Sequence, residues 1–159
     1  MLASFSAAPL LSVSVLAWFS GNPFNGTIFF VFAAFMAFFA LKADTKPVSA
    51  DKGWTFIPGI LLLIFGLVYP HFLETNSFVR YLYAAPTGVI PCPTLSAVIG
   101  LALIFDRYGS NKWSLSLAVI GLFYGVFGVF RLGVTMDVLL LAGALALLFR
   151  TFQKRTQTA

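Results

Sequence analysis

The sequence has few charged residues, one cysteine and one histidine. Lys, Arg, Asp and Glu make up 9% of its 159 residues, whereas hydrophobic residues make up 60%. A chain of this composition cannot cover a folded surface with polar groups, which excludes a soluble globular domain and a nucleic-acid partner. Aromatic residues, at 17%, exclude disorder. The single cysteine excludes an internal disulfide, and the single histidine excludes a bis-histidine haem.

The sequence also lacks the short motifs that carry common enzyme chemistry. It has no glycine-rich phosphate loop, no His-Glu-x-x-His and no Gly-x-Ser-x-Gly. We therefore expect that the chain is not an enzyme. The sequence identifies no cofactor and predicts no metal site.

What the sequence does contain is a series of apolar runs. A helix needs about 20 mostly apolar residues to cross a hydrocarbon core of about 30 Å. Charges and turn-forming clusters divide the chain into six runs, at about residues 7–19, 27–41, 54–68, 93–105, 113–130 and 134–149. We predict an all-α, polytopic integral membrane protein with about six transmembrane helices in a single domain, 1–159.

Prolines and a Gly/Asn cluster define two of these boundaries. Residues 20–26 interrupt the uncharged opening stretch with turn-forming residues, so this stretch is predicted to form two helices. Pro93 is expected at the first position of the fourth helix, where its missing N–H would have had no partner. The N-terminus lacks the basic region of a signal peptide, and we expect the first helix to be retained.

The basic residues predict the orientation. With six spans, eight of the ten basic residues share one side: Lys42, Lys46, Lys52, Arg107, Lys112, Arg150, Lys154 and Arg155. The other side has only Arg80 and Arg131. The positive-inside rule then places both termini in the cytoplasm, with the chain in a bacterial inner membrane. The lipid bilayer is the expected partner, and a homo-oligomer or a larger membrane complex is a further possibility.

The segment 78–91, between the third and fourth helices, is apolar but contains two prolines and a glycine that would interrupt a helix. We predict a short interfacial helix followed by an extended re-entrant strand, since non-helical backbone at membrane depth must be buried in protein or face water. The strand would meet free N–H groups of residues 94–96, which would suit an anion or a carbonyl group. The alternative is a structural plug whose carbonyls cap the fourth helix.

The polar side chains expected on the outer side form the candidate site. A vestibule near the Pro-Cys-Pro turn would be lined by His71, Glu74, Arg80, Tyr83, Thr87, Cys92, Thr94, Arg131 and Asp137. We expect a small transporter or channel-like element for a small solute or ion. The alternative is a non-catalytic accessory or assembly subunit of a larger membrane complex, which the absence of ionisable groups from the middle of the helices favours.

Several of these residues also have structural interpretations. Cys92, held between two prolines, would suit a soft-metal ligand or a thiol nucleophile, but burial of a small side chain is the favoured interpretation because a second thiol is lacking. His71 and Glu74 would share a face if the helix continued, or they form an ordinary interfacial end. Arg131 and Asp137 either close a hairpin as a salt bridge or serve an anion site.

Small residues indicate close packing of the last two helices. Gly121 and Gly125 have the Gly-x-x-x-Gly spacing that lets helix backbones approach. Contact with the following helix is the favoured interpretation, and a homodimer face is the alternative.

The spacing of several short motifs resembles a known family. They are Tyr69-Pro70, Ala84-Ala85-Pro86-Thr87, Pro91-Cys92-Pro93-Thr94, Gly100-Leu101 and Leu132-Gly133-Val134 with Asp137. Over about residues 54–149, this order resembles a bacterial family of uncharacterised multi-span membrane proteins, a domain of unknown function. The resemblance implies a membrane location and singles out residues 86–94, but it implies no activity.

Overall fold

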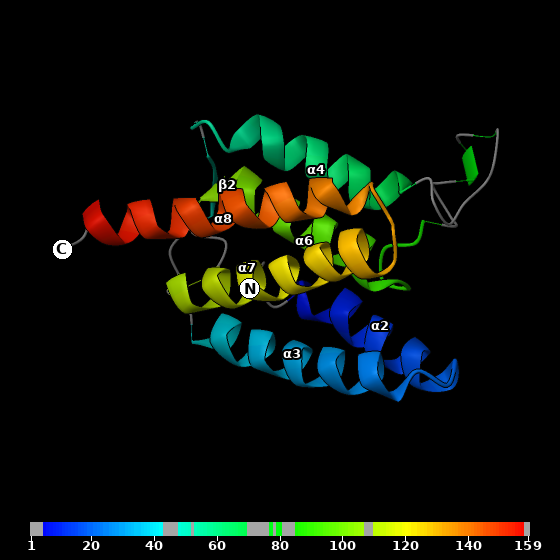
Figure 1. Ribbon diagram of the computed structural model, residues 1–159. Helices are drawn as coiled ribbons and strands as arrows, with labels where there is room; N and C mark the ends of the chain where they lie inside the picture. The colour runs from blue at the N-terminus through cyan, green and yellow to red at the C-terminus, as the bar shows by residue number, and fades with distance from the viewer. Residues whose placement is uncertain are drawn as a thin grey trace.

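The structure is a computed structural model that describes residues 5–42, 48–51, 53–69, 77, 79–80, 85–106 and 110–157. Within these residues, six α-helices lie side by side (Figure 1): α2 (Ala7–Phe19), α3 (Pro23–Leu41), α4 (Phe56–Val68), α6 (Pro91–Ile104), α7 (Asn111–Val126) and α8 (Asp137–Gln157). A π-helical segment, η1 (Phe127–Arg131), continues α7. Two short strands, β1 (Ser49–Ala50) and β2 (Phe105–Asp106), pair in antiparallel register. The predicted all-helical fold is confirmed.

Proline positions explain why two helices begin earlier than predicted. α3 begins at Pro23 instead of residue 27, and the Asn22 side chain caps it by accepting a hydrogen bond of 3.1 Å from the Asn25 N–H. α6 begins at Pro91 instead of Pro93, because Pro91 already provides a first helical residue without an N–H.

The first helix has its predicted bounds, and three other predicted helices differ from the structure at one or both ends. α4 begins at Phe56 instead of residue 54, and α7 begins at Asn111, where the Ser110 side chain accepts from the Trp113 N–H. The last helix runs over Asp137–Gln157 instead of 134–149. Its start is delayed because the residues before Asp137 form a turn, and it continues through a polar C-terminal stretch in which Arg150 and Thr151 are buried and Phe152 and Gln153 are exposed.

α6 is the central helix of the bundle. It packs against α2, α4, α7 and α8, and twelve of its fourteen residues are buried. Glycines let its backbone approach that of α4, since a Cβ at Gly66 would lie 2.6 Å from the Pro93 carbonyl oxygen. Gly125 of α7 likewise lies against the backbone of Leu141 in α8, which confirms the predicted packing of the last two helices.

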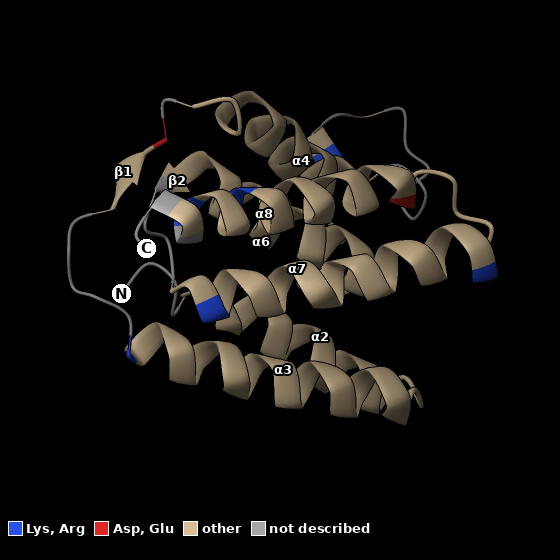
Figure 2. Cartoon of the chain, turned by 60° about the vertical axis from the view of Figure 1, so that its left-hand side comes forward, with Lys and Arg blue, Asp and Glu red and all other residues tan. Residues whose placement is uncertain are grey.

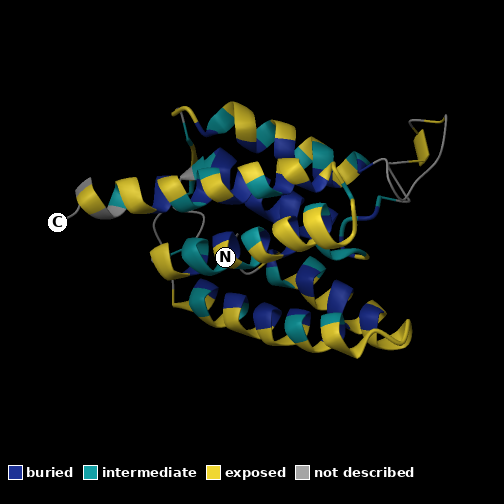
Figure 3. Cartoon of the chain, viewed as in Figure 1, coloured by how far each residue is buried: buried dark blue, intermediate teal, exposed yellow. Residues whose placement is uncertain are grey.

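The outer faces of the bundle are largely apolar. Exposed residues lie along the outward sides of the helices (Figure 3). Large exposed apolar side chains include Phe30, Val31, Phe38, Ile57, Leu61, Ile64, Leu139 and Leu145. Two described segments, Pro23–Leu41 and Asn111–Arg131, are long and apolar enough to span a membrane. α2, α4 and α6 are apolar but have only 13, 13 and 14 residues.

The charged residues are sorted between the two ends of the bundle. α3 ends, α7 begins and α8 ends beside the β1–β2 pair, at what we call the ribbon end, and basic residues gather there (Figure 2). The opposite end, which we call the pocket end, contains the α2–α3 turn, the turn at 85–90 and the connection from η1 to α8. Arg131 and Asp137 belong to the pocket end.

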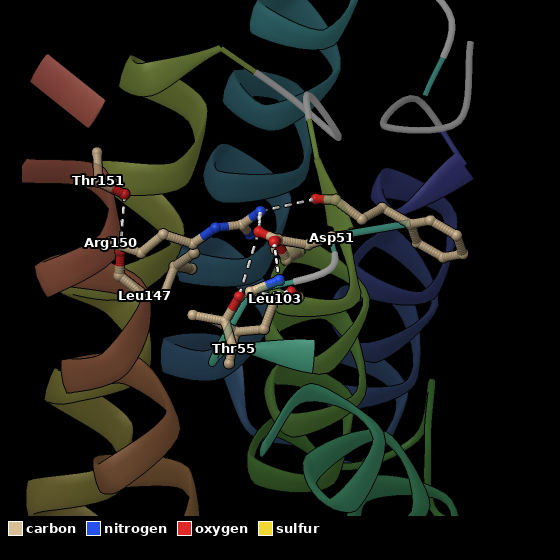
Figure 4. A network of polar contacts seen from close by, with 9 residues as sticks. Asp51, Thr55, Leu103, Leu147, Arg150 and Thr151 are labelled. Atoms are coloured by element: carbon tan, nitrogen blue, oxygen red, sulfur yellow. Dashed lines mark hydrogen bonds and ion pairs between the residues drawn. The ribbon is translucent and has the colours of Figure 1, made fainter. Parts of the chain in front are cut away.

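A buried polar network closes the ribbon end (Figure 4). Arg150 of α8 pairs with Asp51 and donates to the Ala102 carbonyl at the end of α6. The Thr55 hydroxyl donates to the Leu103 carbonyl at 3.1 Å, and the Asp51 N–H donates to the Ile104 carbonyl at 2.7 Å. These donors satisfy the last carbonyls of α6, which a buried helix end requires.

Candidate functional site

The pocket end contains a partly open cavity of about 270 Å³ between α3, α6, α7 and the start of α8. Its accessible surface is mainly apolar, and we call it the polar cavity after the six polar residues that also line it: Asn22, Asn25, Tyr69, Cys92, Tyr124 and Asp137. Segments far apart in the sequence supply these groups, so the cavity exists only in the folded chain.

Asp137 is the only acidic residue among the described residues that line the polar cavity, and it is 1% exposed. The Tyr69 hydroxyl donates to Oδ1 of its carboxylate at 2.6 Å, and Cys92 lines the same cavity. Burial, reinforced by the Asp137 carboxylate, raises the pKa of the Tyr69 hydroxyl just beyond the end of α4, so this hydroxyl remains a donor. No basic side chain pairs with Asp137 in the described part of the chain.

The π-helical segment makes room for this carboxylate. The Leu132 N–H donates to the Phe127 carbonyl, five residues earlier, and the Val134 N–H donates to the Gly128 carbonyl at 2.9 Å. A Cβ at Gly128 would overlap the Asp137 carboxylate. Asp137 also begins α8, where the helix dipole favours a negative charge. Such π-helical interruptions occur frequently at functional sites.

A second polar pair lies on the α3 side of the polar cavity. The Tyr124 hydroxyl donates to Oδ1 of Asn25 at 2.8 Å, and Tyr124 is buried with its ring edge against Phe29. An adjoining cleft of about 400 Å³ shares Asn22, Asn25, Ile90 and Pro91 with the cavity. The cavity therefore adjoins a more open surface beside the α2–α3 turn.

The described part of the predicted re-entrant strand is a turn. The Pro86 carbonyl accepts from the N–H groups of Val89 and Ile90, and Gly88 has φ +84°. A glycine at positive φ after a proline favours a compact turn, and for this reason the prediction of an extended strand is wrong at 86–90. Of the predicted interfacial helix, residues 79 and 80 are described and helical.

Thr87 and Thr94 hold this turn in place. The Thr87 hydroxyl donates to the Gly66 carbonyl at 2.7 Å, and the Thr94 hydroxyl accepts from the Gly88 N–H at 2.7 Å. The Thr94 hydroxyl in turn donates to the Ile90 carbonyl. Both threonines thus link the turn to α4 and α6, and neither is among the residues lining the polar cavity.

The start of α6 does not present the free N–H groups that an anion site needs. Pro91 and Pro93 have no N–H, and the Thr94 N–H donates to the Ile90 carbonyl at 3.3 Å. The adjacent charged group is the Asp137 carboxylate, which would repel an anion. The Ile90 carbonyl caps the Thr94 N–H, as the structural alternative predicts, and the geometry at Thr94 does not support an anion site.

The remaining predicted site residues are not gathered around the polar cavity. Arg80 and Arg131 are exposed, and Arg131 forms no ion pair with Asp137 in the described structure. His71, Glu74 and Tyr83 lie outside the described residues. The structure thus brings together two of the nine, Cys92 and Asp137. Among the described residues, no three His, Cys, Asp or Glu side chains form a metal site.

The sequence analysis missed Tyr69, Tyr124 and Asn25. The sequence analysis names Tyr69 only as part of the Tyr69-Pro70 motif, and it includes Asn25 only in the turn-forming cluster at 20–26. The sequence offered one signal for these three residues: each is a polar residue near the end of a different apolar run. Nothing in their spacing indicated that they meet.

Comparison with known proteins places the chain in a family. A family model described as a family of unknown function, DUF6064, matches residues 13–159. The match includes α3 and most of α2, which the motif resemblance left out. No curated protein and no solved structure matches the chain. With nearly its whole length matched, the chain belongs to DUF6064, a family of unknown function.

Proposed function

We propose that the chain crosses a membrane six times, with both termini on the cytoplasmic side. The apolar exterior of the bundle supports this proposal, because a soluble bundle would expose polar faces. The gathering of Lys42, Lys112, Arg150 and Lys154 at the ribbon end supports the orientation.

The short helices are compatible with six spans. A helix of 13 or 14 residues is about 20 Å long, against a hydrocarbon core of about 30 Å. α6 is enclosed by other helices, so its own backbone is shielded from lipid despite its short length. α4 is preceded by the exposed Trp54, a residue type enriched at membrane interfaces.

A cysteine-accessibility experiment tests the orientation. Cys92 is the only cysteine, so Cys92→Ser provides a background without reactive thiols. Thr135→Cys and Gln153→Cys then place single thiols at exposed positions of the pocket and ribbon ends. We expect a membrane-impermeant maleimide to label position 135 in intact cells and position 153 only after permeabilisation. Labelling of both from outside, or the reverse pattern, contradicts the proposed topology.

For activity, we propose that the protein binds a small solute or ion in the polar cavity as a step in its transport. The main support for this proposal is the Asp137 carboxylate. It is buried, it lines the cavity, and it has no basic partner among the described residues. Ionisable groups are costly inside a membrane protein and generally mark substrate or ion sites.

One observation favours the accessory-subunit alternative. Beyond the polar cavity, α6 is buried by close contacts with its neighbours, and Gly59 and Gly100 bring two backbones together. Transport would require these contacts to open, whereas an accessory subunit would keep them.

Solute flux into proteoliposomes separates the two functions. We expect stopped-flow light scattering to show faster swelling than in empty liposomes for at least one of potassium chloride, choline chloride and glycerol. Asp137→Asn should slow this flux, since it removes the charge beside the cavity. The matched control is Arg131→Ala, because Arg131 is exposed and absent from the cavity lining. Wild-type rates equal to those of empty liposomes for every solute contradict transport and favour the accessory role.

A further inference from the structure

The polar cavity combines one carboxylate with several aromatic rings. Phe24, Phe123 and Phe127 line it together with Tyr69 and Tyr124. The Phe123 and Phe127 rings are stacked with their centroids 6.2 Å apart, and the Phe123 and Tyr124 rings meet edge to face at 5.2 Å. Aromatic faces carry partial negative charge, so both kinds of group attract a cation.

The described lining of the polar cavity contains a single charged residue. Among the described residues that line it, Asp137 is acidic and none is Lys or Arg. The Tyr69 hydroxyl donates a hydrogen bond to the Asp137 carboxylate, and no Lys or Arg among the described residues pairs with it. A cation entering the cavity would supply a counter-charge.

The lining also selects the kind of cation. A metal ion needs several oxygen, nitrogen or sulfur ligands to replace its water shell, and the described residues contain no cluster of three such side chains. A methylated ammonium group needs few hydrogen-bond acceptors and is recognised by aromatic faces. The cavity of about 270 Å³ lies at the small end of ligand sites.

From these observations, we propose that the polar cavity binds a small methylated ammonium cation, held by the Asp137 charge and the faces of the aromatic side chains. The proposal deepens the binding role given to the same cavity above and rests on it. The same ammonium chemistry occurs in a free small molecule and in a choline lipid head group.

Calorimetric titration with choline tests the proposal. The protein is placed in nanodiscs of phosphatidylglycerol, whose head group has no ammonium. The neutral analogue 3,3-dimethyl-1-butanol has nearly the same shape as choline. We expect choline to bind and the neutral analogue to bind at least about tenfold more weakly, because the charge attraction is lost. Absence of choline binding, or equal affinity for both compounds, overturns the proposal.

Two variants locate the binding determinants. Asp137→Asn should weaken choline binding by about tenfold or more. Phe127→Leu, which keeps the Asp137 network, should weaken it by about threefold to tenfold. Its control is Phe130→Leu, because Phe130 lies in the same η1 segment, is 78% exposed and does not line the cavity. Circular dichroism verifies the fold of each variant. Unchanged affinity in folded Asp137→Asn or in Phe127→Leu overturns the proposal.

A second titration distinguishes the two sources of the ammonium group, a free small molecule and a choline lipid head group. In phosphatidylcholine nanodiscs, a head group seated in the cavity would compete with choline and weaken its apparent affinity. Equal affinity in both lipids assigns the site to a free cation. Both outcomes support ammonium recognition, and choline binding without any flux would retain this inference while contradicting transport.

Discussion

Arg150→Met is expected to lower the free energy of unfolding by about 3 kcal/mol, because it removes one partner of a buried ion pair. Asp51, whose side chain is only 20% exposed, would lose its counter-charge, and the Ala102 carbonyl would lose its donor. Thermal unfolding in detergent, followed by far-ultraviolet circular dichroism, measures the effect as a lower midpoint.

Lys112→Met is the matched control for this variant. It removes a basic residue from the same end of the bundle, but Lys112 is exposed, so we expect a change within about 0.5 kcal/mol. Adding Asp51→Asn to Arg150→Met should restore part of the loss, because no uncompensated charge then remains buried. If Arg150→Met unfolds at the midpoint of Lys112→Met, the ribbon-end network contributes nothing to stability.

Gly128→Ala is expected to destabilise the protein by about 3 kcal/mol, the upper part of the usual range for overpacking. The added Cβ would overlap the Asp137 carboxylate, so either η1 or the start of α8 must shift. A shift of Asp137 would also break its hydrogen bond from Tyr69. The same unfolding measurement detects this loss.

Gly133→Asn is the control for Gly128→Ala. Gly133 has φ +70° and no atom within 4 Å of an added Cβ, and asparagine tolerates this backbone conformation better than most residues. We expect a change of less than about 1 kcal/mol. Asp137→Ala in the Gly128→Ala background should recover stability if the carboxylate is the clashing group. A Gly128→Ala protein as stable as wild type would show that the backbone accommodates the extra methyl group.

Local signals were sufficient for most of the helical architecture. The first helix, Ala7–Phe19, has the predicted bounds, because it lies between an apolar start and a turn-forming cluster. The errors at the starts of α3 and α6 occurred where proline-containing segments allow two local structures. Pro91 and Pro93 both fit a first helical turn, and the choice depended on the turn at 86–90.

The candidate site was only partly accessible to sequence analysis. Cys92 and Asp137 were singled out because polar groups near apolar runs are uncommon, and the cavity contains both. The hydrogen bond between Tyr69 and Asp137 joins residues 68 positions apart. Arg150, interpreted from sequence as a cytoplasmic topology signal, is buried against Asp51, 99 positions away. Neither pairing has a local signature.

The sequence by itself determined the helical class and the sorting of basic residues between two sides, because composition and helix-terminating residues act locally along the chain. Only the tertiary structure decided which polar groups meet. It places Asp137 beside Tyr69 and in the same cavity as Cys92, and Arg150 beside Asp51, because buried charges require partners that helix packing brings from distant segments. The same number of polar residues could also lie scattered over the helix ends of a different fold. In this structure, the packing around α6 gathers several of them into one cavity and one buried network.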